Sequence, residues 1–576
     1  MFLSFCFHFS FCFHFSFFHF YTYSRTSTKK KSAAVTNNSN VPHLKDASLK
    51  AEKVLSGLDS PTNIGFIKNN DYIILEKNGT VLRAINGSLL DKPLLKVNVS
   101  NGFFQGMLGI AIAHSNKNSS NTTSAGSSSN NESPLPVFLY YTEDKGNGTS
   151  PIGNRLYRYD LVNNTLINPK MLLNLPVLRD SWGNGGAITI GPDNNIYVTM
   201  GSAGNDDYTP QTMTLNYRNS TVVDGRSGIL RITQDGKPVS PGILGDSYPL
   251  NLYYAYGMEN SYGIDFDPIS KTLWDVENDG SLNDELNIVK PGFNSGYGMI
   301  SGSSIDSPAV PSAVVNFSGK GIYNDPEFVW VKKPVALGTK FLPSDKLGKQ
   351  YQNDLFVAGF QDGRIYYFKL NANRTHLAAL PKSLSSNNPN TLASGDLPIA
   401  DPVIFGEGFG GISNLAVSPD GYLYVVAIGT GDIYRISQSA ANASKTTTTT
   451  SFTNATTTTA ISGQKNVIAV SIEPDASDLA DKAFNPSTVN IKVGDTVVWT
   501  NNDPVIHTIV EGSPSLPSPQ SAIRPEASTA TSAQFKSGFL SQGMTFKHTF
   551  DKPGTFNYYC SVHPTMIGKV VVASSH

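Results

Sequence analysis

The sequence predicts an all-β protein with at least two domains. Glycine and proline are frequent, with 50 and 34 residues, and Asn, Ser and Thr are abundant. Long amphipathic helical stretches are scarce, whereas short apolar runs alternate with turn residues, a pattern typical of strands. The chain has 576 residues. This exceeds one compact core, because a domain usually holds roughly 100–200 residues, or up to about 250 in all-β folds.

One turn type recurs within residues 50–436. The stretches GPDNNIYV from Gly191, DPISKTLWDV from Asp267 and SPDGYLYVV from Ser418 each place a turn before a strand of aromatic and β-branched residues. Successive hairpins of a radially repeated sheet have this pattern. We therefore predict a β-propeller over residues 50–436.

A Thr-rich segment marks the clearest domain boundary. Residues 437–464 contain long runs of Thr, Ser, Ala and Asn, which cannot bury a core and predict a solvated linker. Residues 465–576 then return to alternating strand patterns, such as Val489–Trp499 with a turn at Gly494 and Asp495. A second, smaller β domain is expected there.

The charge and the cysteine content argue against a nucleic-acid partner and against disulfide bonds. The formal net charge is −1 and only 15% of residues are charged, so no basic surface indicates nucleic acid. Cysteine occurs only at Cys6, Cys12 and Cys560. Because the first two lie in an unusual leader, the rest of the chain has no disulfide to form, and Cys560 needs its own explanation.

Residues 1–49 are predicted to be an apolar leader followed by a disordered segment. Residues 1–22 are long enough to enter a membrane, which needs roughly 20 residues, but they lack the basic start and cleavage site of a signal peptide. A membrane anchor, a signal and a misassigned start all remain open. Asn-x-Ser/Thr triplets, as at Asn78, Asn147 and Asn454, indicate a glycoprotein. We expect an extracellular or cell-surface location.

Four residues of the C-terminal domain form a candidate copper site. Cys560, His563 and Met566 lie within seven residues, which places them in one tight loop between two strands. His507 follows a distant strand and turn and completes the set. Two imidazoles, one thiolate and a weak thioether are the ligands of type 1 copper in electron-transfer sites. Zinc, the alternative, prefers four strong ligands.

The same domain resembles cupredoxins, especially the plastocyanin and amicyanin-like group. The resemblance implies a β-sandwich with one copper ion held by His507, Cys560, His563 and Met566. It also implies that His563 is the port through which electrons pass to a redox partner. The motifs that carry it are Asn485-Pro486, Gly494–Trp499, the Asp503-Pro504-x-x-His507 turn, Phe550–Cys560 and Cys-x-x-His-Pro-x-Met.

The larger domain resembles soluble quinoprotein sugar dehydrogenases of the glucose/sorbosone type. The resemblance implies a six-bladed β-propeller that binds pyrroloquinoline quinone (PQQ) and calcium. Its motifs extend in order over nearly all of residues 50–436. They include Gly106–Ala111, Tyr140–Thr142, Gly185-Gly186 with Gly191-Pro192-Asp193, Tyr254–Asn260, and Glu277 through Asp284–Asn287 followed by Pro291-Gly292.

Some cleft positions of that family are retained. Asn260, Asn278 and Asp284 match polar positions of the cofactor and substrate cleft, and Glu285 matches an acidic position near structural calcium. These residues would serve equally well as hydrogen-bonding and capping groups inside a propeller. The resemblance alone leaves both roles open.

Other positions needed for quinone chemistry are lost. Oxidation of a sugar hydroxyl needs a general base, and Gly183 stands where the family has that His, with Asp180 the nearest substitute. Charge-assisted contacts contribute about 1.5–3 kcal/mol each, so losing several predicts that tight PQQ binding is absent. The family's cations are replaced by Glu259, Gln361 and Gly411–Ser413, and Arg364 lies on the other side of the turn glycine.

Two functions follow as hypotheses. The first is a copper electron-transfer protein at the cell surface whose propeller is a binding or positioning platform. The alternative is a PQQ-dependent sugar or alcohol dehydrogenase that passes electrons to its own copper domain. Both predict a redox protein or a membrane-associated electron donor or acceptor as partner, with a sugar or alcohol as a further ligand. The sequence identifies no catalytic residue.

Overall fold

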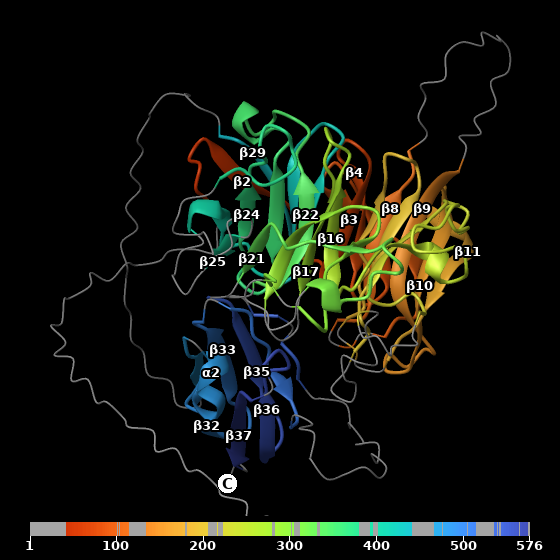
Figure 1. Ribbon diagram of the computed structural model, residues 1–576. Helices are drawn as coiled ribbons and strands as arrows, with labels where there is room; N and C mark the ends of the chain where they lie inside the picture. The colour runs from red at the N-terminus through yellow and green to blue at the C-terminus, as the bar shows by residue number, and fades with distance from the viewer. Residues whose placement is uncertain are drawn as a thin grey trace, which may run out of the picture. The chain divides into compact units, whose positions relative to one another are not determined.

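The chain divides into two units, Met1–Ser39 and Asn40–His576, and only the second is described here. The computed structural model (Figure 1) describes residues 42–573 with gaps, the longest being 115–133, 205–215, 380–391, 440–465 and 514–534. The predicted leader of residues 1–22 and most of the predicted linker lie outside the described residues. No helix among the described residues has the length and apolar character needed to cross a membrane.

The described part of the larger domain contains six sheets, and three of them begin in its N-terminal half. Their strands are mainly antiparallel; the first two sheets use consecutive strands, whereas the third adds two short parallel strands from later in the chain. The first sheet contains β3 (Pro61–Lys68), β4 (Asp71–Glu76), β5 (Thr80–Ile85), β6 (Ser88–Leu89) and β7 (Leu95–Lys96). The second contains β8 (Met107–Ile112), β9 (Leu135–Asp144), β10 (Pro151–Val162) and β11 (Thr165–Leu175). The third contains β12 (Ile188–Ile190), β13 (Ile196–Met200), β14 (Gly228–Ile232), β15 (Tyr253–Tyr256), β19 (Phe293–Asn294) and β20 (Ile322–Tyr323).

The remaining three sheets combine later strands with the two described N-terminal ones. The fourth contains β16 (Ser261–Phe266), β17 (Leu273–Asn278), β18 (Asp284–Val289), β21 (Phe328–Trp330) and β25 (Leu392–Ser394). The fifth contains β22 (Ala336–Phe341), β23 (Leu355–Gly359), β24 (Ile365–Phe368), β26 (Ile404–Glu407) and β1 (His43–Leu44). The sixth contains β27 (Ile412–Val417), β28 (Leu423–Ala427), β29 (Asp432–Gln438) and β2 (Leu49–Leu55).

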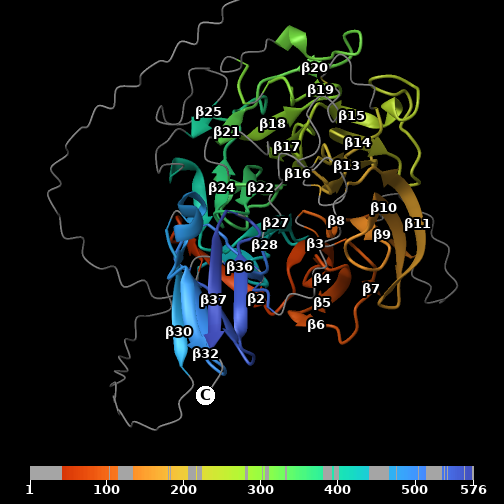
Figure 2. The same cartoon turned by 90° about the horizontal axis from the view of Figure 1, so that it is seen from below.

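The six sheets close into a ring. The innermost strands β3, β8, β12, β16, β22 and β27 contact one another in that order, and β27 contacts β3 again. Figure 2 shows β3, β8, β16, β22 and β27 around the centre of the larger domain. The N-terminal strand β2 completes the last sheet by antiparallel pairing with β29. The propeller prediction is confirmed, and the six sheets agree with the predicted six blades.

The three recurring turns join the first and second strands of their sheets. In the last of them, the Ser418 N–H donates to the Tyr422 carbonyl at 2.9 Å. The aromatic residue of the following strand is buried each time, with Tyr197, Trp274 and Tyr424 exposed by 3%, 0% and 2%. The repeated motif therefore delivers a large apolar side chain to the packing between sheets, where aromatic burial is most effective.

The smaller domain is a sandwich of two sheets. Alternate residues of β33 face inward, so Val497 and Trp499 are fully buried in its core. One sheet contains β31 (Phe484–Asn485), β30 (Val467–Ile472), β33 (Thr496–Asn501) and β35 (Thr545–Thr549). The other contains β32 (Thr488–Lys492), β37 (Ile567–Ala573), β36 (Gly554–Tyr559) and β34 (Val510–Glu511). Short helical turns complete the two domains: η1 (Leu250–Leu252), η2 (Pro311–Ala313), η3 (Lys349–Tyr351), η5 (Asp401–Val403), α2 (Ala476–Leu479) and η6 (Ala480–Lys482).

We predict that the ring depends on its N-terminal strand. Deleting residues 1–56 removes the two-residue strand β1 and all of β2, including Leu49, which is 5% exposed, and leaves β29 as an open edge. We expect a fall in Tm of at least about 5 °C and greater aggregation, measured by circular dichroism during heating. Deleting residues 1–41 keeps every described strand and is the matched control. Equal Tm values for the two deletions would contradict the role of β2.

Candidate metal centre and propeller cleft

Three donor atoms converge at one end of the smaller domain. The Cys560 Sγ atom lies 3.6 Å from His507 Nδ1 and 3.9 Å from His563 Nδ1, and the two Nδ1 atoms are 3.2 Å apart. The point equidistant from all three is about 2.1 Å from each, which fits metal bonds of roughly 2.0–2.3 Å to nitrogen and sulfur. Among the described residues, no other His, Cys, Asp and Glu side chains form such a group of three.

A tight loop contains three of the four predicted ligands. Cys560 directly follows β36, and its N–H donates to the Met566 carbonyl at 3.1 Å. The Met566 N–H donates in turn to the His563 carbonyl at 3.0 Å. These bonds close the loop, and Met566 is fully buried in the same apolar core as Cys560. Met566 and Cys560 are therefore both shielded from water in one core.

His507 reaches the site from the loop after β33 and is oriented by Asp503. The His507 Nε2 atom lies 2.9 Å from Asp503 Oδ2, and both residues are buried. Burial alone lowers the pKa of His507, but the carboxylate of Asp503 raises it above its ordinary value. Because Nε2–H donates to the carboxylate, Nδ1 keeps its lone pair for a metal.

Asp503 is itself held in place. Asn501 Oδ1 accepts from the Asp503 N–H, and Asp503 Oδ2 accepts from the Ala476 N–H, both at 2.9 Å. Burial would raise the pKa of Asp503, but its bond to His507 holds the pKa below the ordinary value. The sequence motif contained Asp503 without revealing its role, because that role depends on which ring nitrogen faces inward.

The sulfur of Cys560 is prepared as a thiolate. Burial by itself would raise the pKa of the thiol, but His507 and His563 lower it to about 5 in the metal-free site. The Thr508 N–H also donates to Sγ at 3.3 Å, a contact that sequence analysis did not foresee. A low thiol pKa marks a cysteine suited to metal binding.

The predicted cleft residues bind the main chain of neighbouring strands and loops. Asn260 Oδ1 accepts from the Gly185 N–H at 3.0 Å. Asn278 Nδ2 donates to the Ala336 carbonyl at 2.7 Å, and Asp284 Oδ2 accepts from the Ala336 N–H at 3.0 Å. Each of these side chains thus contributes to the cohesion of the propeller, which is the structural role left open by the sequence.

Glu285 belongs to a buried acidic pair. It lies opposite Glu277 on paired strands β17 and β18, and its Oε1 accepts from the Gly302 N–H at 2.7 Å. Burial, together with the negative charges of Glu285 and Asp275, raises the pKa of Glu277 well above its ordinary value. A proton or a cation would relieve this repulsion.

At the positions that lost their catalytic or cationic residues, the described side chains are engaged in other contacts. A Cβ atom on Gly183 would lie 2.8 Å from Ser202 Oγ and 2.9 Å from Ser202 N, so a larger residue requires the backbone to move. Ser413 Oγ donates to a main-chain carbonyl at 2.8 Å. Arg364 Nε lies 3.4 Å from a carboxylate oxygen of Glu407. Asp180 lies outside the described residues.

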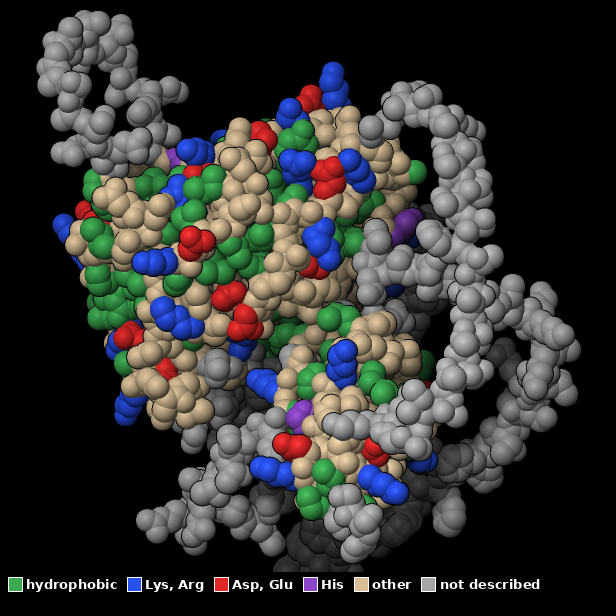
Figure 3. Space-filling model, turned by 180° about the vertical axis from the view of Figure 1, so that it is seen from behind, with side chains coloured by type: hydrophobic (Ala, Val, Ile, Leu, Met, Phe, Trp, Pro, Cys, Tyr) green, Lys and Arg blue, Asp and Glu red, His purple; other side chains and the backbone are tan. Residues whose placement is uncertain are grey.

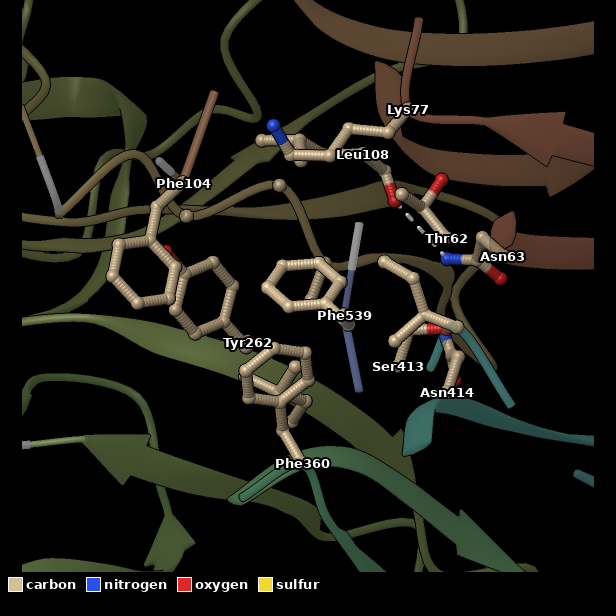
Figure 4. Close-up of a pocket in the computed structure, with 15 residues that line it drawn as sticks. Thr62, Asn63, Lys77, Phe104, Leu108, Tyr262, Phe360, Ser413, Asn414 and Phe539 are labelled. Carbon is tan, nitrogen blue, oxygen red and sulfur yellow. Dashed lines mark hydrogen bonds between the residues drawn. The ribbon is translucent and has the colours of Figure 1, made fainter. Parts of the chain in front are cut away.

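The centre of the propeller contains an apolar cavity. Its lining includes Phe104, Tyr262, Phe360 and, from the smaller domain, Phe539, whose rings gather around one space in Figure 4. The cavity volume is about 80 Å³, whereas small-molecule sites usually hold roughly 300–1,000 Å³. In this arrangement the cavity is too small for a multi-ring cofactor.

Lys77 is the one charged side chain among the described residues that line this cavity. Its Nζ atom donates to the Gly102 carbonyl at 2.7 Å. Burial lowers the pKa of Lys77 to about 7, and the positive charge of Lys536 adds to the effect against a small opposing contribution from Asp59. Lys77 could not be recognised from the sequence as a cavity residue, because a Lys beside an Asn-Gly turn resembles an ordinary surface residue.

Comparisons with known proteins agree with both domains. Residues 58–435 match the family of glucose/sorbosone dehydrogenases, and residues 470–573 match copper-binding proteins of the plastocyanin/azurin family. The chain is 23% identical over 405 residues to an aldose sugar dehydrogenase of Escherichia coli K12, covering 68% of this chain and 93% of that protein. It is 31% identical over 87 residues to a plastocyanin of Scenedesmus fuscus, covering 15% of this chain and 81% of that protein.

A solved structure supports the fold of the larger domain. A crystal structure of a Thermus thermophilus oxidoreductase, named as a glucose dehydrogenase, aligns with a TM-score of 0.50 and 22% identity. The alignment covers 67% of this chain and 99% of that one. At this identity the match concerns the fold alone.

We predict that Asp503 is needed for tight copper binding. Asp503→Ala removes the acceptor that orients His507, and loss of such a partner typically weakens metal affinity about 10–100-fold. Asp503→Asn keeps an acceptor oxygen and should lose less. Affinity is measured by competition with a copper chelator, and Asp551→Ala, which removes an exposed carboxylate of the same domain, is the control. Equal affinities for Asp503→Ala and the control would contradict the orienting role.

Proposed function

Because this chain belongs to the glucose/sorbosone dehydrogenase family and carries a copper-binding domain of the plastocyanin/azurin family, we propose that it is an electron-transfer protein. In this proposal His507, Cys560, His563 and Met566 hold one copper ion. The supporting observation is the convergence of Cys560 Sγ with two Nδ1 atoms at 3.6 and 3.9 Å. Copper in such a site supplies one-electron transfer with little change of geometry.

Several side chains of this domain orient the proposed copper ligands or stabilise the thiolate. Asp503 holds His507 in the tautomer that presents Nδ1. The Thr508 N–H stabilises negative charge on Sγ, and hydrogen bonds to this sulfur are one of the features that set the reduction potential. His507 and Cys560 are fully buried, whereas His563 is only partly buried. His563 is therefore the ligand best placed to exchange electrons with a partner.

The propeller, in the same proposal, is a platform and not a quinone enzyme. Gly183 has no space for a general base, and while Phe539 of the copper domain occupies the cavity, the remaining volume of about 80 Å³ is too small for PQQ. Its one charged described lining residue is Lys77, whose pKa of about 7 leaves only part of it charged at neutral pH. Tight binding of a tricarboxylate quinone would need several cations.

A dehydrogenase remains the second candidate. It is favoured by the similarity to the E. coli aldose sugar dehydrogenase over most of the propeller. In that case the cleft would have to open for PQQ, with Asn260, Asn278 and Asp284 as contacts. A calcium ion near Glu277 and Glu285 would relieve the repulsion of that buried pair.

Partners and location follow from the electron-transfer proposal. Figure 3 shows positive and negative side chains interspersed over the visible face. A nucleic-acid partner would call for clustered positive charge, so this face gives no support for one. A redox protein or a membrane-associated electron donor or acceptor fits His563, and a sugar or alcohol is a further candidate ligand of the propeller. We propose that the protein works outside the cell or at its surface, where the N-terminal apolar segment is a candidate anchor and the Asn-x-Ser/Thr triplets are candidate glycosylation sites.

We predict that the copper-loaded chain is blue because of Cys560. The thiolate-to-copper transition of this ligand type absorbs at about 600 nm, so Cys560→Ser should abolish the band. Met566→Leu should keep the band and raise the reduction potential, because the weak axial ligand is removed. Cys6→Ser and Cys12→Ser are the matched controls and should leave the spectrum unchanged. A colourless oxidised wild-type protein with bound copper would exclude the proposed site.

We predict no sugar oxidation by the propeller. The full chain is incubated with PQQ and calcium, and reduction of a dye is followed with a panel of aldoses. Without a base at Gly183 and without the cations, turnover should not exceed that of free PQQ. The E. coli aldose sugar dehydrogenase is the positive control. Saturable turnover by the wild-type chain would favour the dehydrogenase.

A further inference from the structure

We propose that the mouth of the propeller cleft is a docking surface for the copper domain of the same chain. Its anchors are Ile506 and Phe539, and it turns the His563 imidazole toward Gln361. Residues 40–576 form one compact unit, and both anchors belong to an apolar cluster with propeller residues. We call this set the docking cluster: Phe360, Ile428, Ile506, Val335, Leu337 and Phe539.

Ile506 of the copper domain is buried against the propeller. It precedes the ligand His507 in the chain, yet it is 1% exposed and does not belong to the core of the copper domain. Its burial comes from the docking cluster, where it packs with Phe360 and Ile428. An apolar side chain beside a metal ligand that is buried only by another domain indicates a surface suited to association.

Phe539 of the copper domain packs against an aromatic ring of the propeller. Its ring meets that of Phe360 at a centroid distance of 5.4 Å and an interplanar angle of 89°, which is a favourable edge-to-face arrangement. Phe539 also lines the central cavity together with Phe104 and Tyr262, and Figure 4 shows its ring among theirs. A single aromatic side chain seated in a preformed pocket is the usual anchor of a specific interface.

A polar contact between the two domains involves a predicted copper ligand. His563 Nε2 lies 3.4 Å from the Gln361 side-chain amide. His563 Nδ1 faces Cys560 Sγ, so its Nε2 carries the hydrogen when Nδ1 holds a metal. The Gln361 atom at this distance is Nε2, and rotation of the amide by half a turn brings Oε1 to the same place. In that orientation Gln361 can accept the hydrogen of a metal-bound His563.

One interaction opposes docking. The positive charge of Lys536 in the copper domain disfavours a charge on Lys77 in the cavity. Their repulsion weakens as salt increases, so docking becomes tighter at higher ionic strength. An interface held by a few apolar anchors against a like-charge pair is suited to reversible association.

Docking has two consequences. It fills the cleft with Phe539, which leaves about 80 Å³, and it covers the edge of His563 that would meet an outside redox protein. Exchange with such a protein then requires release of the copper domain from the propeller. The propeller would thus control access to the copper, which deepens the platform role proposed above.

The test uses the copper-loaded full chain and four variants. Phe539→Asp removes the anchor from the copper domain, and Gln361→Lys replaces the acceptor by a cation on the propeller. Val467→Asp, at a position that is 70% exposed, and Gln352→Lys, at an exposed position, are the matched controls. Small-angle X-ray scattering reports docking, and stopped-flow reduction by ferrocytochrome c reports access to His563.

Phe539→Asp and Gln361→Lys should each increase the radius of gyration and speed reduction by at least about tenfold, whereas both controls behave as wild type. If Phe539→Asp and Gln361→Lys both had the radius of gyration of the wild type, the docking proposal would be overturned. A wild-type chain as extended as both variants would overturn it as well.

The rate of reduction depends on the proposed copper function, whereas the scattering measurement does not. If Phe539→Asp were expanded but the copper-loaded chain had no blue band, docking would be supported and the copper assignment would be refuted. Gln361 is only partly buried, so Gln361→Lys keeps the proposal testable even where Phe539→Asp fails to fold.

Discussion

The structure depends on a thiolate buried between two imidazoles. Cys560 is fully buried, and an isolated anion there would be strongly disfavoured. It is tolerated because His507 and His563 face Sγ at 3.6 and 3.9 Å. That arrangement requires a loop closed onto Met566, a sandwich that brings β33 near β36, and a carboxylate at Asp503 to fix one ring. The copper domain can be understood as the scaffold for these requirements.

The propeller shows the opposite combination of fold and chemistry. Its ring is complete, and β2 closes it against β29, yet its centre is apolar where family members need charge. Gly183 has no space for a larger side chain, and Phe360 contributes an aromatic ring to the cavity. A retained ring with several of the expected cations missing fits the proposed platform role.

The sequence predicted the features that depend on local spacing. Cys560 and His563 were recognisable because a short loop determines their proximity, and the propeller was recognisable because its turns repeat. The count of blades came from family resemblance, since the pattern alone does not say how many sheets close a ring. Asp503, Lys77 and Phe539 escaped prediction as functional residues because their importance arises from tertiary contacts with residues far away in the chain.

X-ray absorption at the copper edge tests the central claim most directly. For one equivalent of copper bound to the full chain, the account predicts one sulfur and two nitrogen neighbours at roughly 2.0–2.3 Å. The nitrogens would be those of His507 and His563, and the sulfur that of Cys560. A spectrum with only nitrogen and oxygen neighbours would contradict the account.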